Sequence, residues 1–181
     1  MKFIRNTNRT QRQRGYVLNE LVLAVAIIVI ASGAGFVIYK TLAKDTETSS
    51  QINGIVDFLS KSKETFGLSG GNWNSFSAAN MIKLNRIPSQ FTKDATKIYD
   101  ANGNEVVFKA PAAAQGTVSF LMRSSEECAK ITQAVAELSY IASVGASGSE
   151  SSVKTATTKL DIDAMATGCA VANRVLTLAV R

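Results

Sequence analysis

The amino-acid sequence predicts an α+β protein in which one long N-terminal helix packs on a small antiparallel β-sheet domain. Two observations support this fold class. An apolar run without any charged residue, from Leu21 to Tyr39, is followed by a segment whose apolar residues recur at helical spacing. After residue 66, short β-prone runs alternate with turn residues, which is typical of an antiparallel sheet with short connections.

The first 15 residues are basic and contain no acid. Their positive charges come from Lys2, Arg5, Arg9, Arg12 and Arg14. The whole chain has a formal net charge of +6, so almost none of the excess lies in residues 16–181. A nearly neutral body is no footprint for a phosphate backbone, and we expect no nucleic acid to be bound directly. Positive charge beside an apolar run stays cytoplasmic, so everything after Lys40 should lie outside.

The apolar run is long enough for a membrane helix. It approaches the roughly 20 residues that a helix needs to cross the hydrocarbon layer, and we expect a retained span over about residues 21–39. A cleaved secretory signal is the alternative, because Ala31-Ser32-Gly33-Ala34 offers small residues. The apolar run nevertheless continues past them to Tyr39.

A second, amphipathic stretch predicts that this helix continues into the soluble part. Its apolar positions are Ile52, Ile55, Val56, Leu59 and Phe66. No proline precedes Pro88, so we expect one helix from about Val17 to about Thr65 within a helical segment 16–66. Gly33 and Gly35 permit bending or close helix packing. The following Gly67–Asn72 loop lacks the Lys-Ser/Thr of a phosphate-binding loop.

Residues 67–181 are expected to form a globular α+β head domain. Ser75–Pro88 predicts a short helix followed by a turn, and Gly116–Met122 predicts a strand. Thr96–Ala110 places Asn102-Gly103 between two β-prone runs, which is a strong hairpin signal.

The same hairpin raises the possibility of a calcium site. Asp100, Asn102 and Asn104 have the first spacings of a calcium loop, but Glu105 stands where that loop needs its glycine. We interpret these residues as turn formers.

The last third of the chain predicts a capped helix, a linker and a final strand. Ser124-Ser125-Glu126-Glu127 forms a capping box, and the apolar stripe after it comprises Cys128, Ile131, Val135, Leu138 and Ala142. Gly145–Thr158 reads as a small-polar linker or surface loop. Cys169–Val180 is apolar and β-branched enough for a buried last strand.

The composition excludes several kinds of active site. The chain contains no histidine, so Ser-His-Asp or Cys-His catalysis cannot be built from it. Its two cysteines, Cys128 and Cys169, make a poor zinc site alone and, outside the cytoplasm, predict a disulfide. Asp161 and Asp163 are the best candidates for a polar site but are better explained as helix-cap or turn carboxylates. We therefore expect no enzyme, metal or cofactor.

The stretch "RGYVLNEL", Arg14 to Leu21, resembles the cleavage region of type IV prepilins. In that family a basic leader ends in glycine, and a glutamate lies five residues into the apolar helix that follows. The layout is similar to that of the type IVb group, which includes PilS-like pilins and the toxin-coregulated pilin. Members of the group share a Cys-bearing amphipathic helix, here "ECAKITQAV", and a second cysteine near the C-terminus.

The resemblance implies processing and assembly roles for three residues. A prepilin peptidase would cut after Gly15, release residues 1–15 as a leader, and methylate the new amine at Tyr16. Glu20 would meet the N-terminal amine of a neighbouring subunit as helices bundle. The amine is cationic at neutral pH, and two opposite charges entering a low-dielectric bundle should do so as a pair. The alternative is an interfacial carboxylate without a partner.

The function that this resemblance implies is that of a structural filament subunit. The precursor would be stored in the inner membrane of a Gram-negative bacterium and polymerised by a membrane platform with its ATPase. The resulting homo-oligomeric, helical surface pilus would serve adhesion, aggregation or conjugation. One alternative is a minor pilin or a secretion pseudopilin. Another is a binding module or enzyme on a single-span anchor.

Overall fold

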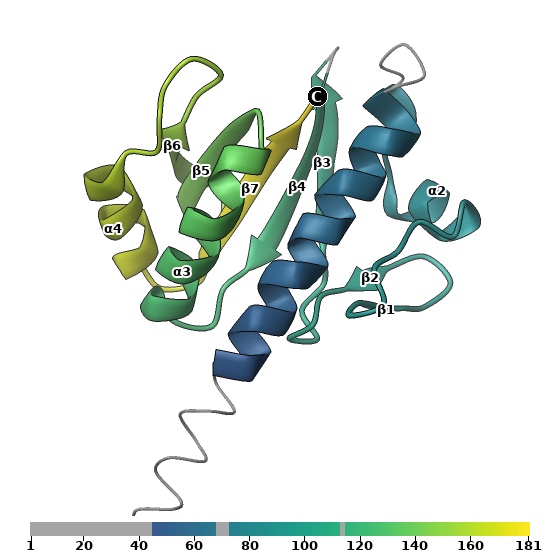
Figure 1. Ribbon diagram of the computed structural model, residues 1–181, viewed down its shortest axis with the longest axis horizontal. Coiled ribbons are helices and arrows are strands. Elements are labelled where there is room, and N and C mark those ends of the chain that lie inside the picture. The colour runs from purple at the N-terminus through teal and green to yellow at the C-terminus, as the bar shows by residue number, and fades with distance from the viewer. Residues whose placement is uncertain (1–44, 68–72, 113–114) are drawn as a thin grey trace, which may run out of the picture. The chain divides into compact units, whose positions relative to one another are not determined.

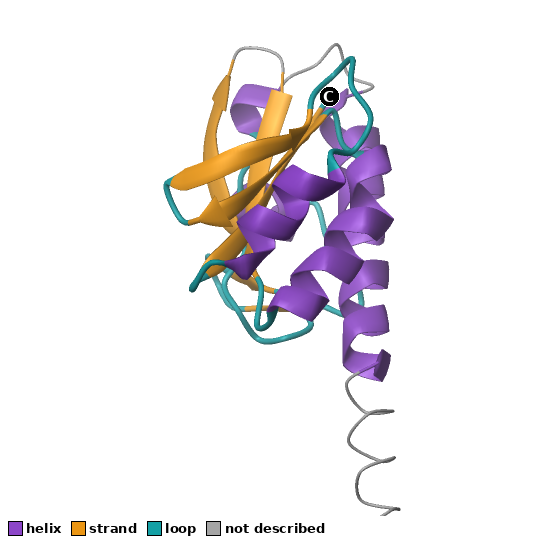
Figure 2. Cartoon of the chain, turned by 90° about the vertical axis from the view of Figure 1, so that its left-hand side faces the viewer, coloured by secondary structure: helices purple, strands orange, loops and turns teal. Residues whose placement is uncertain are grey.

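Helices and an antiparallel sheet form two layers in the computed structural model, which describes residues 45–67, 73–112 and 115–181 (Figure 1). Figure 2 shows the strands on one side and the long helices on the other. The predicted α+β class is confirmed for this part of the chain. The basic leader, the predicted membrane span and the glycine pair at 33 and 35 lie outside the described residues. In the described ranges, no helix combines the length and apolar character needed to cross a membrane.

The predicted amphipathic helix covers residues 45–62 and ends in a π-helical turn, η1 (Lys63–Gly67). Ile55, Leu59 and Phe66 are buried, as their helical spacing predicts, and Ile52 and Val56 pack partly buried against the same core. The second half of the expected long helix is therefore confirmed, and residues 45–181 form one compact unit.

Aromatic rings connect this helix to the sheet and to the segment between them. Phe58 is fully buried, and its ring lies 5.9 to 6.3 Å from four other rings. These rings belong to Phe76, Phe91, Phe108 and Phe120. Each such pair contributes roughly 0.5–1.5 kcal/mol beyond the area that it buries. The helix is thus fixed on the sheet by packing at its centre.

The main sheet has five antiparallel strands in the order β3-β4-β7-β5-β6. Their bounds are β3 (Val107–Ala112), β4 (Gln115–Leu121), β5 (Ile141–Ala146), β6 (Ser149–Lys154) and β7 (Arg174–Val180). The predicted strand 116–122 corresponds to β4. The predicted last strand is confirmed over β7, which lies between β4 and β5 and is almost completely buried.

The capped helix is α3 (Ser125–Val135), followed by the short 3-10 helix η3 (Ala136–Leu138). The Ser124 hydroxyl accepts from the Glu127 amide at 3.1 Å, as the capping box predicts. The expected apolar stripe is wrong beyond Val135. Leu138 is 41% exposed, and Ala142 is buried in β5 instead. The chain leaves the helix because pairing with β7 satisfies the backbone of residues 141–146 while burying their inward side chains.

The predicted linker Gly145–Thr158 is also corrected, because most of it belongs to the sheet. Strand β5 ends at Ala146, a turn with Gly148 at φ +86° follows, and β6 pairs back on β5. Strand β6 is an edge strand, and among its residues only Val153 is fully buried. Its other side chains face water or the open sheet face, which is why its composition resembles that of a loop.

The turn at Asn102-Gly103 is present, but the predicted hairpin is only partly confirmed. Gly103 has φ +79°, and Tyr99 pairs with Glu105 across the turn. The flanking runs then separate. Strand β2 (Ile98–Tyr99) joins β1 (Thr92–Lys93) in a small sheet, whereas β3 joins the main sheet.

The expected short helix before this turn is α2 (Ala78–Lys83), which follows the 3-10 helix η2 (Trp73–Ser75). The Ser77 hydroxyl caps it by accepting from the Asn80 amide. Asn85, with φ +52°, then reverses the chain, so the predicted helix and turn are both confirmed.

The main sheet is strongly curved, as an ion pair between its two edge strands shows. The Lys109 Nζ of β3 lies 2.7 Å from a carboxylate oxygen of Glu150 in β6. In a flat sheet the backbones of strands four positions apart would be separated by about 19 Å, which is too far for two side chains to bridge. The Lys109 ammonium also contacts the Thr177 hydroxyl of the central strand at 3.4 Å. Gly145 permits β6 to lie close to β5, because a Cβ there would be 2.9 Å from the Glu150 Cα.

Candidate functional site

The residues that the sequence assigns to processing and assembly, Gly15, Tyr16 and Glu20, lie outside the described residues and remain predictions. What the structure does describe is how the head domain is fastened together. Besides the aromatic core, two features do this: a disulfide, and a set of buried polar contacts between helix 45–62, the 100–104 turn and α3.

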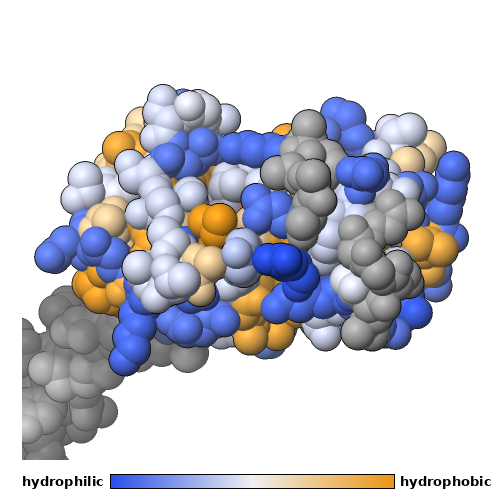
Figure 3. Space-filling model, turned by 90° about the horizontal axis from the view of Figure 1, so that it is seen from above, coloured by the Kyte–Doolittle hydropathy of each residue, from blue (hydrophilic) through white to orange (hydrophobic). Residues whose placement is uncertain are grey.

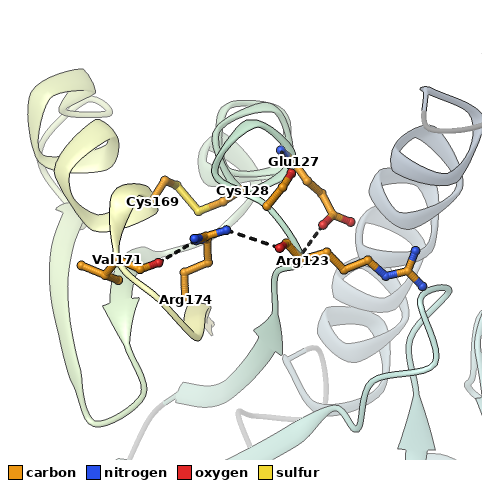
Figure 4. The surroundings of a disulfide bond; sticks show 7 residues. Arg123, Glu127, Cys128, Cys169, Val171 and Arg174 are labelled. Carbon is orange, nitrogen blue, oxygen red and sulfur yellow. Dashed lines mark hydrogen bonds between the residues drawn. A yellow bond between two sulfur atoms is a disulfide. The ribbon is translucent and has the colours of Figure 1, made fainter. Parts of the chain in front are cut away.

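Cys128 and Cys169 form a disulfide with their Cα atoms 5.7 Å apart (Figure 4). Both residues are buried, and among the described residues no free cysteine remains. The predicted pair is therefore present. Cys128 lies in the first turn of α3, next to the capping glutamate that fixes where this helix begins.

The element that carries Cys169 differs from the prediction. Cys169 lies near the end of α4 (Ile162–Ala170), not in the last strand, so the disulfide joins two helices. Met165, Gly168 and Cys169 form the buried face of α4, and a Cβ on Gly168 would lie 2.6 Å from the Val144 carbonyl oxygen. Cys169 and Ala170, which the sequence assigned to a strand, thus belong to a helix that packs closely on β5.

Backbone-directed arginine contacts lie beside the disulfide. The Arg174 Nε donates to the Val171 carbonyl at 2.8 Å, and its Nη1 donates to the Arg123 carbonyl at 3.4 Å (Figure 4). The Glu127 carboxylate in turn accepts from the Arg123 amide at 2.8 Å. The end of β4, the start of α3, the end of α4 and the start of β7 are thereby held together.

A buried polar cluster, made of Gln51, Asp100, Asn102 and Glu127, links helix 45–62 to the head. The Gln51 amide donates to the Asp100 carboxylate at 2.8 Å and accepts from the Ala101 amide at 2.9 Å. The Asn102 side chain donates to Glu127 at 2.6 Å. Gln51 is fully buried and Asp100 is 2% exposed, so these contacts replace water for both groups.

Asp100 is the most perturbed group of this cluster. Burial raises the pKa of its carboxyl, and the hydrogen bonds from the Asn104 and Asn102 amides and from Gln51 oppose that rise. The nearby Glu127 carboxylate adds to it. Burial therefore makes the ionised carboxylate less favourable than it is in water, and protonation would remove this desolvation cost.

Exposed ion pairs surround the polar cluster. Arg123 lies 2.9 Å from Glu47, and Lys130 lies 3.2 Å from Asp45 and 3.0 Å from Glu126. Such exposed pairs contribute little stability each, roughly 0–1 kcal/mol. Their value is positional, because they attach the first described turn of helix 45–62 to α3.

The residues with calcium-loop spacing, Asp100, Asn102 and Asn104, form a turn, as interpreted from the sequence. One Asp100 oxygen accepts from the amides of Asn102 and Asn104, both at 2.9 Å. Asp161 caps α4 by accepting from the Ala164 amide, as its cap interpretation predicts. Over the part of the chain that the structure describes, no group of three or more acidic or cysteine side chains could hold a metal ion.

Sequence reasoning missed the polar cluster. Gln51 and Asp100 are 49 positions apart, and neither belongs to a recognisable motif. The one available signal was a polar residue, Gln51, one position before the apolar stripe of a helix.

The arrangement of an amphipathic helix laid on an antiparallel sheet is similar to the fold of a solved type IV pilin. A crystal structure of TcpA, a type IV pilin from Vibrio cholerae El Tor biotype, matches with a TM-score of 0.55 at 10% sequence identity. The match covers 75% of this chain and 99% of that one.

Sequence comparison adds no family assignment to this likeness of fold. No protein-family model matches the chain. No curated protein matches it either.

Proposed function

We propose that this chain is a structural subunit of a type IV pilus. The observation that carries the proposal is the docking of an amphipathic helix on one face of a pilin-like sheet, in a chain whose sequence places a prepilin-like segment and an apolar run before that helix. Helix 45–62 is attached by an aromatic core and by the Gln51 cluster. A filament that transmits force through its helices needs a head fastened to them in this way.

Processing follows from the sequence before the described helix. Prepilin peptidase removes residues 1–15 by cutting after Gly15, and the new amine at Tyr16 is methylated. The cut at the cytoplasmic face leaves the apolar helix in the inner membrane. The subunit is stored there, with its head outside, until the ATPase-driven platform polymerises it.

Glu20 directs assembly in this proposal. A carboxylate within an apolar helix is costly in hydrocarbon, and pairing with the Tyr16 amine of a neighbouring subunit offsets that cost. Because each subunit offers one amine and one carboxylate, the contact is heterologous, and repeated without closing into a ring it propagates as an open helix. The homo-oligomer is therefore a filament.

The type IVb group, with its PilS-like and toxin-coregulated pilins, is the subfamily we propose. The basis is the 15-residue leader together with the Cys-bearing α3 and the second cysteine on a separate element. A surface fibre for adhesion, aggregation or conjugation is the corresponding role.

Replacing Glu20 tests the proposal. Glu20→Ala should give a processed, membrane-embedded, disulfide-bonded protein that enters surface fibres poorly, and Glu20→Gln should lie nearer Ala than wild type because an amide cannot neutralise an ammonium. The intact mass of subunits from purified fibres should equal that of a chain that begins at Tyr16 and carries one added methyl group. Fibres at wild-type yield from Glu20→Ala would contradict the pairing.

The same measurements separate the alternatives. A minor pilin or pseudopilin would be a rare component of fibres built mainly from another subunit. A domain on a single-span anchor would form no fibres and would tolerate Glu20→Ala, because losing the charge makes the span more apolar.

A further inference from the structure

The chain contains two asparagine-glycine pairs, and the fold places them in different settings. Asn102-Gly103 lies at the turn before β3, whereas Asn53-Gly54 lies inside helix 45–62. An asparagine that precedes glycine is chemically labile, because glycine has no side chain to hinder the approach of its own backbone nitrogen to the asparagine side chain. The chain therefore carries a candidate reactive site together with an internal reference.

The two nitrogen atoms that would react at Asn102 are both engaged as hydrogen-bond donors. The side-chain nitrogen, Nδ2, donates to the Glu127 carboxylate at 2.6 Å. The Gly103 backbone amide donates to the Asp100 carbonyl at 2.9 Å, and the Asn102 backbone amide donates to the Asp100 carboxylate at 2.9 Å. In the closed turn, the nitrogen that would attack and the nitrogen that would leave are thus both held in place.

Docking of helix 45–62 keeps this turn closed. The fully buried Gln51 side chain of the helix donates to the Asp100 carboxylate and accepts from a backbone amide of the turn. The Arg123 guanidinium, which also pairs with the first described turn of the helix, donates to the Asn102 carbonyl at 2.7 Å. Undocking of the helix would remove these restraints together.

The turn also contains features that favour opening. The Asn102 Oδ1 is buried and has no hydrogen-bond partner among the described residues, which is unfavourable for an acceptor. Opening would hydrate this oxygen, so local opening costs less than it would in a fully satisfied turn. Gly103 is exposed, and a Cβ on it would meet no atom within 4 Å, so water has access to the reacting bonds.

We propose that Asn102 is a site of spontaneous deamidation whose rate is set by the docking of helix 45–62. In the opened turn the Gly103 nitrogen loses its proton and bonds to the Asn102 Cγ. The Cγ–Nδ2 bond then breaks, and ammonia leaves with that proton. Water opens the resulting cyclic imide at either of its two carbonyl carbons and gives aspartate or isoaspartate. One water is consumed and one ammonia is released, so no oxidant or reductant is needed.

The place of the new carboxylate decides its effect. Figure 3 shows the end of the head where β7 finishes, and hydrophilic residues are common on its coloured surface, so an added charge would change little there. The 100–104 turn lies at the opposite end (Figure 1), because Asn104 contacts the carbonyl of Leu121, which pairs with the start of β7.

At the turn, deamidation would replace a donor to Glu127 with a charged acceptor in a buried polar cluster that already contains Asp100. Like charges in such a site are unfavourable, so the attachment of helix 45–62 to the head should weaken. Loss of ammonia to the solvent makes the change permanent. A head whose helix has undocked is thereby marked irreversibly. This inference goes beyond the proposed filament function, because it concerns covalent change in the head with or without assembly.

The test measures loss of the side-chain amide in full-length protein in nonionic detergent at mildly alkaline pH. One sample is native, one is unfolded in urea, and peptide mapping by mass spectrometry follows Asn102 and Asn53 separately. In urea both sites should react at similar rates. In the native protein both should react more slowly, because the polar cluster protects Asn102 and helical hydrogen bonds protect Asn53.

Variants that break the cluster separate local from global protection. Glu127→Ala and Gln51→Ala should each speed the native reaction at Asn102 roughly tenfold to a hundredfold, the rise in opened turn expected from losing a buried hydrogen bond that involves a charged group. Asn53 should stay slow in both variants, which reports that the head is still folded. Glu126→Ala is the matched control, because this exposed neighbour pairs with Lys130 instead, and it should react like wild type.

A second measurement examines the product. Asn102→Asp reproduces one deamidation product and should lower the urea midpoint of the head. Asn53→Asp adds the same charge at an exposed position of helix 45–62 and should lower the midpoint far less.

Several results would overturn the inference. Native wild type could react at Asn102 as fast as it does in urea, or the two cluster variants could react at the wild-type rate. Those variants could also speed Asn53 as much as Asn102, which would make global unfolding the controlling step. An unchanged urea midpoint for Asn102→Asp would show that the product does not weaken the attachment. Since unassembled subunits are measured, none of these outcomes bears on whether the chain forms filaments.

Discussion

Removing the disulfide should lower the stability of the head domain substantially. Cys128 and Cys169 are 41 positions apart, and closing a loop of that length restricts the unfolded chain by roughly 4 kcal/mol in the loop-entropy estimate. A domain of this size is stable by about 5–15 kcal/mol in total. The variant Cys128→Ala with Cys169→Ala should therefore remain folded only with a much reduced margin.

The structure also predicts which part loosens first. Helix α4 lies at one side of the sheet and depends on the disulfide and on its Met165–Cys169 face, whereas β4, β7 and β5 pair along their whole lengths. After reduction we expect proteinase K, which cleaves after many residue types, to cut first within residues 155–161, just before α4. The β5–β6 hairpin should stay protected.

Urea unfolding of wild type and of the double variant measures the loss of free energy, and timed proteolysis with mass spectrometry locates the first cut. Wild type treated with reductant serves as the matched control, because it changes no side chain other than the two thiols. Equal urea midpoints with equal slopes would refute the loop-entropy reasoning. A first cut inside residues 141–154 would contradict the proposed order of loosening.

Three further predictions concern the core and the polar contacts. The pKa of Asp100 is raised in the fold, so protonation of its carboxyl stabilises the fold at pH values below the ordinary pKa of 3.8. This contribution to the free energy of unfolding is lost as the pH rises through the folded pKa. Asp100→Asn should flatten this pH dependence, as measured by urea titrations at several pH values. Gly168→Ala should cost about 1–3 kcal/mol because its Cβ would meet the Val144 carbonyl oxygen at 2.6 Å, and Ala166→Ser on the exposed face serves as control. Burial alone would raise the pKa of Glu150, but its hydrogen bond with Lys109 lowers the pKa overall, so this pair stabilises at neutral pH and the contribution fades as pH falls. Lys109→Met should lower the free energy of unfolding by about 1 kcal/mol at pH 7, a modest figure because Lys109 is partly exposed. The loss should be smaller in acid. An equal loss of stability at both pH values would contradict the pairing.

Elements with a clear apolar period could be predicted from the sequence. The residues Ile55 and Leu59 lie on the buried side of helix 45–62 as their spacing indicates, and Ser124 caps α3 as its motif indicates. Strand β6 could not be predicted, because an edge strand of a curved sheet buries so little that serine and glutamate suffice. Local composition therefore indicates secondary structure only where one face of the element is buried.

The candidate site was predictable to a smaller degree. The cysteine pair followed from the compartment and from the absence of histidine, but the placement of Cys169 on a helix did not. Its neighbours Ala170 and Val171 suit a strand as well as a helix, and close packing against Val144 decides the matter. The Gln51–Asp100 contact is created entirely by the tertiary fold.

The central position of β7 has a consequence for how the head is made. It is the last of the described strands in sequence, yet it separates β4 from β5, so the β3–β4 and β5–β6 hairpins cannot join into one sheet until residues 174–180 have been synthesised. During translation the complete five-stranded sheet therefore cannot form while only the earlier strands are outside the ribosome. Contacts that join such distant segments also slow folding, because chain entropy is lost before the pairing compensates for it. The two hairpins thus become one sheet only after β7 has emerged.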